Sequence, residues 1–130
     1  MLITKSIYKD PSPEDGLRVS IMSRHTLKDG VTPDPDIQQC SLHIPTFGPA
    51  PKLIGKFYRD EVTWDEFKKL YLEQIRTNPK VISKIKLFAK MALQTDITFL
   101  CVEEDADSCH RKLFAEECQR LVPELVVVHR

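Results

Sequence analysis

The sequence lacks an excess of charge of either sign. Its 130 residues include 19 Lys and Arg and 19 Asp and Glu, so the formal net charge is zero. A protein that coats a nucleic-acid duplex normally carries a basic excess or a concentrated basic stripe. The balanced charge therefore argues against non-specific nucleic-acid binding.

Long hydrophobic runs are also absent. No apolar stretch approaches the roughly 20 residues of a membrane-spanning helix, and the first ten residues, MLITKSIYKD, do not have the apolar core and cleavage site of a signal peptide. We therefore expect a cytoplasmic protein with no membrane partner. Disulfides are uncommon in that compartment, which predicts reduced thiols at all four cysteines. These are Cys40, Cys101, Cys109 and Cys118.

Several familiar catalytic motifs are missing. The four glycines, at positions 16, 30, 48 and 55, are isolated, which excludes a Walker loop and a dinucleotide-binding fingerprint. No arginine stands six residues after a cysteine, as the phosphatase loop requires. There is no paired CxxC or HxxxH, and the adjacent Cys109 and His110 cannot easily bind the same ion. We predict neither a metal site nor a cofactor.

The N-terminal part of the chain predicts two strands and a long loop. The strands cover residues 2–8 and 17–22, and the second alternates apolar and other residues with a period of two. The segment 26–51 holds five of the nine prolines and two of the four glycines, so we expect an irregular loop there. A compact domain rarely carries so long a loop unless it covers or binds a ligand.

The rest of the chain alternates helices and strands. A short helix is expected over 52–58, and a second follows a capping box formed by Thr63 and Glu66. A third begins at Asn78-Pro79, with lysines along the edges of its apolar face. The remaining elements are a strand over 97–102, a helix over about 107–121 and a strand over 124–128.

This order predicts a single α/β domain over residues 1–130. We expect a small, mostly parallel sheet of about four strands flanked by helices, in a Rossmann-like three-layer arrangement with right-handed crossovers. The apolar C-terminal strand, LVVV at 125–128, would lie at a sheet edge and could pair in a homodimer.

Chemically capable side chains follow the strand at 97–102. In parallel sheets ligands bind beyond the carboxyl ends of the strands, where helix N-termini point. Cys109 has two interpretations. With Ser108 as the helix cap, the helix dipole and neighbouring positive charge favour a nucleophilic thiolate. With Asp105 as the cap, Cys109 packs beneath the helix.

The neighbouring residues have two interpretations as well. His110 is either the general base or a surface residue. Arg111 either binds an anion or pairs with an acidic residue of the preceding turn. Arg24 and His25 follow the strand at 17–22, so in a parallel sheet they would share one edge with residues 109–111 and complete an anion-binding cluster.

Three blocks resemble a known family. SIMSRHTLKDGVTPDP, PAPKLIGKFYRDEVTWDEFKKLYLEQIR and ITFLCVEEDADSCHRKLFAEEC are similar to the family called domain of unknown function 488. The resemblance implies a compact prokaryotic α/β protein with no established activity. The family often has proline at the position of Ala106, just after Asp105, and this family pattern favours Asp105 as the helix cap. This sequence also has Lys28 where a related version has asparagine.

The leading hypothesis is an anion-binding pocket at the carboxyl edge of the sheet, suited to a phosphorylated or nucleotide-like ligand. If the protein is an enzyme, we expect Cys109 as nucleophile, His110 or His25 as base, and Arg24 or Arg111 as the anion-binding residue. The alternatives are a non-catalytic regulatory or interaction module, in which Cys109 only packs, and a nucleic-acid accessory protein.

Overall fold

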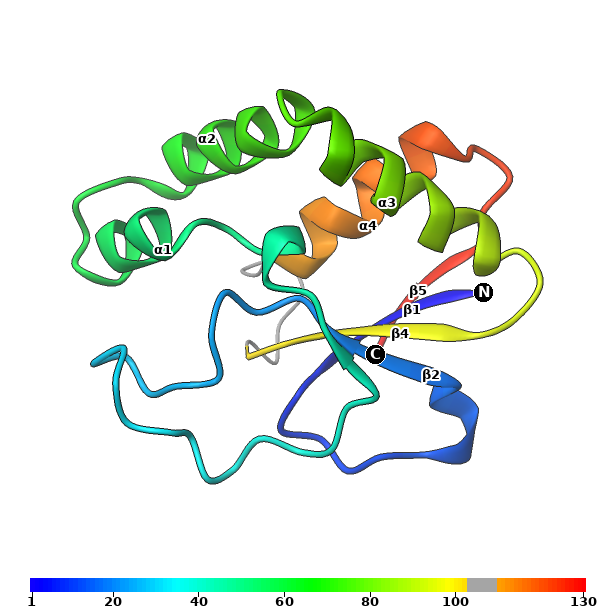
Figure 1. Cartoon of the computed structure of the whole chain (residues 1–130), viewed down its shortest axis with the longest axis horizontal. Coiled ribbons are helices and arrows are strands. Elements are labelled where there is room, and N and C mark those ends of the chain that lie inside the picture. Colours follow the sequence, from blue (N-terminus) through cyan, green and yellow to red (C-terminus); the bar gives the residue numbers. More distant parts are fainter. Residues whose placement is uncertain (103–109) are drawn as a thin grey trace.

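The computed structural model describes residues 1–102 and 110–130. The chain forms a central sheet with its helices gathered over one face (Figure 1). Cys109 and the acidic turn before it lie outside the described residues, so both interpretations of Cys109, and the identity of the helix cap, stay predictions.

In the part of the chain that the structure describes, the sheet has five strands, all parallel, in the order β3-β2-β4-β1-β5. They are β1 (Leu2–Ser6), β2 (Leu17–Ser20), β3 (Leu42–His43), β4 (Ile97–Cys101) and β5 (Val127–His129). The predicted α/β fold with a parallel sheet flanked by helices is confirmed, with one strand more than expected. The additional strand, β3, has two residues, and so short a segment carries no alternating pattern.

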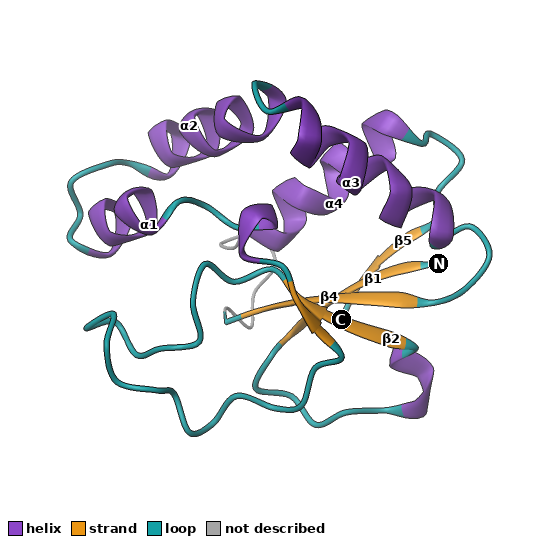
Figure 2. Cartoon of the chain, viewed as in Figure 1, coloured by secondary structure: helices purple, strands orange, loops and turns teal. Residues whose placement is uncertain are grey.

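Within the described residues, four α-helices and two short 3-10 helices connect these strands. They are η1 (Pro13–Asp15), η2 (Pro45–Phe47), α1 (Pro51–Tyr58), α2 (Trp64–Arg76), α3 (Pro79–Met91) and α4 (His110–Leu121). The α-helices lie on one side of the sheet, and the long connections that precede and follow β2 lie on the other (Figure 2). Right-handed crossovers account for this division, because the chain moves along the sheet in one direction from β1 to β3 and in the opposite direction from β3 to β5.

Local sequence signals set the helix starts. The Thr63 hydroxyl accepts a hydrogen bond from the Glu66 amide at 3.1 Å, and the Glu66 carboxylate accepts one from the Thr63 amide at 3.2 Å. The Asn78 side chain accepts a bond from the Lys80 amide at 3.2 Å and precedes Pro79. The predicted capping box and the predicted start of the third helix are therefore confirmed.

The main core lies between the helices and the sheet, and η2 places an aromatic ring at its centre. Phe47 is fully buried, and its ring centroid lies 4.9 Å from that of Phe114 and 5.7 Å from that of Phe88. The Tyr71 hydroxyl donates to the Phe47 carbonyl oxygen at 2.5 Å. Gly48 follows, and a Cβ there would lie 2.4 Å from the Ile21 carbonyl oxygen. This close approach fixes η2 against the end of β2.

The opposite face holds a buried ion cluster. The Asp15 carboxylate is fully buried and lies 2.5 Å from Arg18 Nη1 and 3.1 Å from Lys5 Nζ. The cluster joins η1 to β1 and β2, and it leaves the carboxyl edge of the sheet free for other side chains. Among the helices that the structure describes, none is long and apolar enough to cross a membrane.

Candidate functional site

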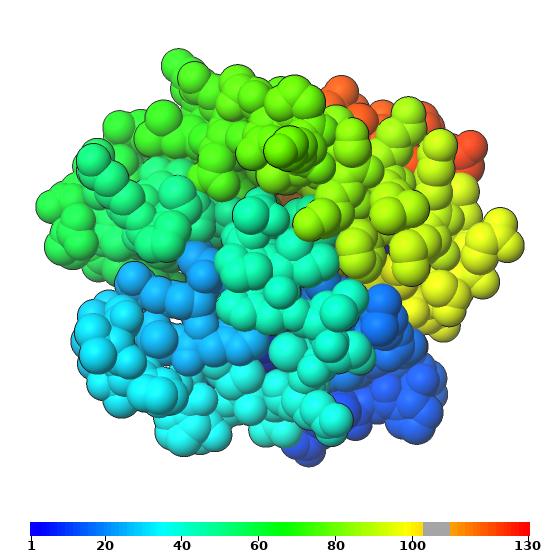
Figure 3. Space-filling view, in the orientation of Figure 1, coloured from blue at the N-terminus to red at the C-terminus, as the bar shows by residue number. Residues whose placement is uncertain are grey.

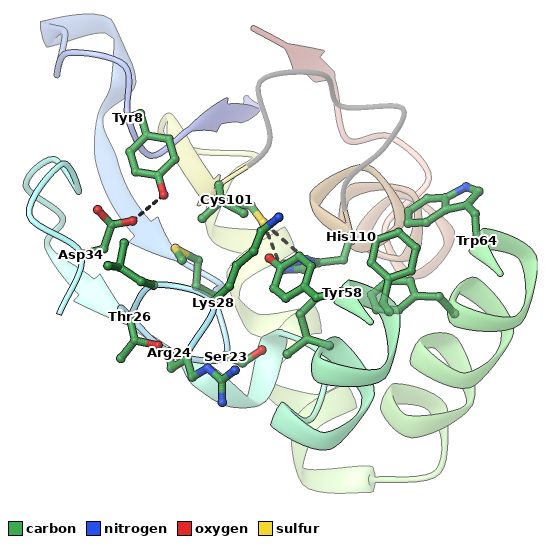
Figure 4. A pocket seen from close by; sticks show the side chains of 16 residues that line it. Tyr8, Ser23, Arg24, Thr26, Lys28, Asp34, Tyr58, Trp64, Cys101 and His110 are labelled. Carbon is green, nitrogen blue, oxygen red and sulfur yellow. Dashed lines mark hydrogen bonds between the residues drawn. The ribbon is translucent and has the colours of Figure 1, made fainter. Parts of the chain in front are cut away.

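A pocket of about 330 Å³ opens at the carboxyl edge of the sheet. Tyr8 follows β1, Arg24 follows β2 and Cys101 ends β4, and all three line it. His110, the first residue of α4, closes its inner end, while α1 and α2 supply an aromatic wall (Figure 4). The parallel sheet thus brings together residues from distant parts of the sequence, as expected for strands that end at one edge.

The floor of the pocket is a thiol beside an imidazole. Cys101 is 1% exposed, and its Sγ lies 3.4 Å from Nδ1 and 3.5 Å from Nε2 of His110. The His110 ring is 5% exposed, and its Nε2 lies 2.9 Å from the Ile21 carbonyl oxygen. The ring also meets the Tyr71 ring edge-on at 5.6 Å between centroids. These contacts hold the imidazole in one place against the sheet.

One wall of the pocket is aromatic. Trp64 and Phe67 stack with ring centroids 5.4 Å apart, and Phe57 of α1 lies 4.9 Å from Phe67. Tyr58 completes this wall. Flat apolar walls of this kind suit a planar ring system, because stacking and loss of water-exposed apolar surface both favour its binding.

The mouth of the pocket is basic. Arg24 is half-buried and lines the pocket, and among the described residues it forms no ion pair. Its guanidinium group packs against Gly30, where a Cβ would lie 2.8 Å from Nη1. The Lys28 ammonium lies 4.9 Å from the centroid of the Tyr58 ring and extends across the pocket (Figure 4). Cations that form no ion pair within the described residues favour an anionic ligand.

A second hollow adjoins this mouth and continues its basic character. Arg24, Lys28 and Tyr58 line both spaces. The second is also lined by Asp29, by Lys52 of α1 and by the C-cap residue Arg59, which pairs with Glu61 at 3.0 Å. In the space-filling view, the chain that follows β2 lies alongside the surface of α1 (Figure 3). An elongated ligand could therefore extend from the aromatic pocket to the basic hollow.

The acidic groups near the mouth accept hydrogen bonds from other residues. Asp29 accepts bonds from the Thr32 hydroxyl at 2.5 Å and from the Val31 amide at 2.9 Å. These hydrogen bonds, the Thr32 hydroxyl foremost, lower the pKa of Asp29, and the positive charge of Arg24 contributes to the same shift. Asp34 accepts a bond from the Tyr8 hydroxyl at 2.5 Å. Neither carboxylate forms an ion pair with Arg24 or Lys28 within the described residues.

The structure brings together some of the predicted site residues. Arg24 and His110 line the same pocket. His25 does not line it: its Nε2 hydrogen-bonds the Ser20 hydroxyl at 2.7 Å, and its ring stacks on His43 with centroids 3.9 Å apart. Burial and the neighbouring His43 lower the pKa of His25, which favours a neutral ring. His25 therefore supports the chain behind Arg24.

Arg111 lies apart from the pocket as well. Its side chain is completely buried within the first turn of α4 and does not contribute to the lining. The predicted cluster of two arginines and two histidines is thus reduced, among the described residues, to Arg24 and His110. Within the same residues, no group of three His, Cys, Asp or Glu side chains is placed to hold a metal ion.

Sequence reasoning missed two main components of the site. Cys101 ends an apolar run, which is typical of a core residue. It is buried in a small core cluster, as that pattern indicates, and it also faces His110 at the pocket. Lys28 and Tyr58 meet across the mouth from separate segments, and neither segment has a pattern that predicts this contact. Tyr8 could have been found, because it follows β1 just as Arg24 follows β2.

The comparison with protein-family models identifies the family of this chain. The family model described as the active DUF488-N3 subclade matches residues 2–120. The chain belongs to the DUF488 family. The resemblance seen in three sequence blocks is thereby confirmed over nearly the whole chain. No curated protein and no solved structure matches this DUF488 protein.

Proposed function

We propose that this DUF488 protein binds a small phosphorylated ligand of the nucleotide type at the carboxyl edge of its sheet. The observation that carries the proposal is the pair of cations at the mouth, Arg24 and Lys28, above an aromatic pocket. Neither cation forms an ion pair within the described residues, so a ligand phosphate would supply the missing negative charge. The volume of about 330 Å³ lies in the range of small-molecule sites.

The two ends of the site suit different parts of a nucleotide. The base would stack in the aromatic pocket against Trp64 and Phe57, which present flat apolar surface. The phosphate would lie at the mouth, where the planar guanidinium group of Arg24 can donate two parallel hydrogen bonds. Lys28 and Lys52 would add positive charge beside it.

The proposal is tested by titration calorimetry with AMP, GMP, CMP and UMP and with the corresponding nucleosides. At least one monophosphate should bind, and its nucleoside should bind ten-fold or more weakly, because hydrogen bonds to charged groups contribute about 1.5–3 kcal/mol. No binding of any of the four at millimolar concentration, or equal binding of nucleotide and nucleoside, would overturn the proposal.

Substitution of single cations tests where the phosphate of the nucleotide binds. Arg24→Ala should weaken nucleotide binding about 10-fold to 100-fold and leave nucleoside binding unchanged. Lys90→Ala is the matched control, since Lys90 is an exposed cation near the C-terminal end of α3, away from the pocket lining. Equal weakening by both variants would indicate a general charge effect and remove Arg24 from the site.

A catalytic role is a second candidate, favoured by one finding. The matched family model is described as that of an active subclade. If this description extends to the present chain, the pocket that binds the ligand is the place for the reaction. A binding module without catalysis would show the same nucleotide affinity and no turnover of the bound ligand.

A further inference from the structure

One end of the pocket carries a negative charge. Asp34 lines the pocket, and its Oδ2 accepts a hydrogen bond from the Tyr8 hydroxyl at 2.5 Å. Tyr8 and Asp34 lie together at this end, and Trp64 lies at the opposite end (Figure 4). A carboxylate repels a phosphate and accepts hydrogen bonds. This end of the pocket therefore suits a neutral part of a ligand that donates hydrogen bonds.

The Asp34 carboxylate is held in place from several sides. Its Oδ1 accepts a hydrogen bond from the Asp36 amide at 3.0 Å, and the Asp34 amide donates to the His25 carbonyl oxygen at 3.2 Å. Tyr8 adds its bond from the chain that follows β1. A side chain that is already oriented loses little conformational freedom when a ligand binds, so the carboxylate is prepared for a ligand.

The same carboxylate has hydrogen-bonding capacity left over. An ionised carboxylate offers about four acceptor positions on its two oxygens. The Tyr8 hydroxyl occupies one position on Oδ2, and the Asp36 amide occupies one on Oδ1. Asp34 is half-buried, so the remaining positions are only partly covered by the protein. One position on each oxygen is therefore open to a ligand that brings two neighbouring donors.

From this arrangement we propose that Asp34 binds the 2′- and 3′-hydroxyls of a ribose, so that the site prefers ribonucleotides to deoxyribonucleotides. The inference rests on the proposed nucleotide site and names the group that fills its acidic end. Two hydroxyls on adjacent carbons offer two donors side by side, one for each carboxylate oxygen. Acidic side chains bind ribose hydroxyls in this way in dinucleotide-binding folds.

The shape of a nucleotide agrees with the positions of the groups in the pocket. In a nucleoside 5′-monophosphate, the base and the carbon that carries the phosphate leave one face of the ribose ring, and the 2′- and 3′-hydroxyls leave the other. In Figure 4, Arg24 and Lys28 lie between the aromatic end at Trp64 and the acidic end at Asp34. A base at the aromatic wall and a phosphate at Arg24 would thus direct the hydroxyls of the ribose to Asp34.

The test compares AMP, GMP, CMP and UMP with their 2′-deoxy forms by titration calorimetry. The ribonucleotide that binds most tightly should bind about 10-fold or more tightly than its 2′-deoxy form. The deoxy sugar leaves a charged acceptor without its donor, and hydrogen bonds to charged groups are among the stronger ones. Equal affinity of the two forms, or tighter binding of the deoxy form, would overturn the proposal.

A variant of Asp34 shows whether this carboxylate is the source of the preference. Asp34→Asn keeps the shape of the side chain and replaces one acceptor oxygen by a donor. The ratio of the two affinities is the readout, because removal of a negative charge changes the attraction for the phosphate equally in both nucleotides. The ratio should fall close to one. Asp36→Asn is the matched control, since Asp36 is exposed and does not line the pocket, and it should leave the ratio unchanged.

An unchanged ratio in a folded Asp34→Asn variant would also overturn the proposal, because Asp34 would then meet another part of the ligand, such as an amino group of the base. If this variant does not fold, the wild-type comparison decides the matter alone. The proposed nucleotide site can survive this failure: binding that needs the phosphate but shows no preference for ribose removes only the role of Asp34. Binding of none of the nucleotides at millimolar concentration removes the site and this inference together.

Discussion

Replacing Asp15 with asparagine should cost this protein a large part of its stability. Asp15 is fully buried, with its carboxylate 2.5 Å from Arg18 Nη1 and 3.1 Å from Lys5 Nζ. Asp15→Asn nearly preserves the shape of the side chain but leaves two buried cations without their shared counter-charge. Breaking a buried ion pair on one side typically costs about 3–5 kcal/mol. The total free energy of unfolding of a domain is only about 5–15 kcal/mol.

Urea unfolding at pH 7 measures this loss as a lower midpoint with an unchanged slope. The matched control is Glu14→Gln, which removes the same charge at the neighbouring exposed position and should change stability by less than about 0.5 kcal/mol. A loss below about 1 kcal/mol for Asp15→Asn would show that the cluster does not stabilise the fold as argued.

The stability lost in the Asp15→Asn variant should also depend on pH. Burial on its own would raise the pKa of Asp15, but hydrogen bonds from the Ser12 amide, Lys5 and Arg18 outweigh it and lower the pKa. The stabilisation by Asp15 is therefore complete at pH values above its pKa in the unfolded chain, about 3.9. It is lost as the pH falls through the lower pKa of Asp15 in the folded protein. The difference between wild type and Asp15→Asn should shrink below about pH 4. A constant difference from pH 7 to pH 3 would refute the reasoning.

Two further predictions concern the chain behind the pocket and the start of α2. Burial and His43 lower the pKa of His25, so as the pH falls the unfolded chain takes up a proton before the folded protein does, and stability should fall below about pH 6.5. His25→Gln should reduce the change in the thermal unfolding midpoint between pH 7.5 and pH 5. An unaltered dependence of the midpoint on pH would contradict this. Thr63→Ala removes the hydroxyl that caps α2 and should cost about 1 kcal/mol in urea unfolding. Thr95→Ala, at an exposed position after α3, should cost less than about 0.5 kcal/mol, and equal losses would mean that the cap contributes nothing.

Local signals made much of the fold predictable from sequence. The capping box at Thr63 and the Asn78-Pro79 start each depend on residues within one turn, so the sequence contains the whole interaction. The alternation in β2 and the apolar run in β4 predicted strands that the structure confirms. The two-residue strand β3 was missed because its pairing with β2 is decided by the course of a long loop.

The sequence predicted where the site lies better than it predicted which residues line it. The rule that parallel strands end at one edge predicted that Arg24 and His110 would approach the same region, and both line the pocket. It could not predict that His25 would turn away to stack on His43, because adjacent residues after a strand have no fixed direction. Nor could it separate Cys101 from the core, because that cysteine ends a strand whose residues are all buried.

The measurement that tests the central claim most directly is a titration of the assigned amide NMR spectrum with AMP. The account predicts that signals of Arg24, Lys28 and His110 shift together and saturably, because these residues line the pocket. The signal of Lys90, near the end of α3, should stay in place. Shifts confined to α3, or none at saturating AMP, would contradict a nucleotide site at the carboxyl edge of the sheet.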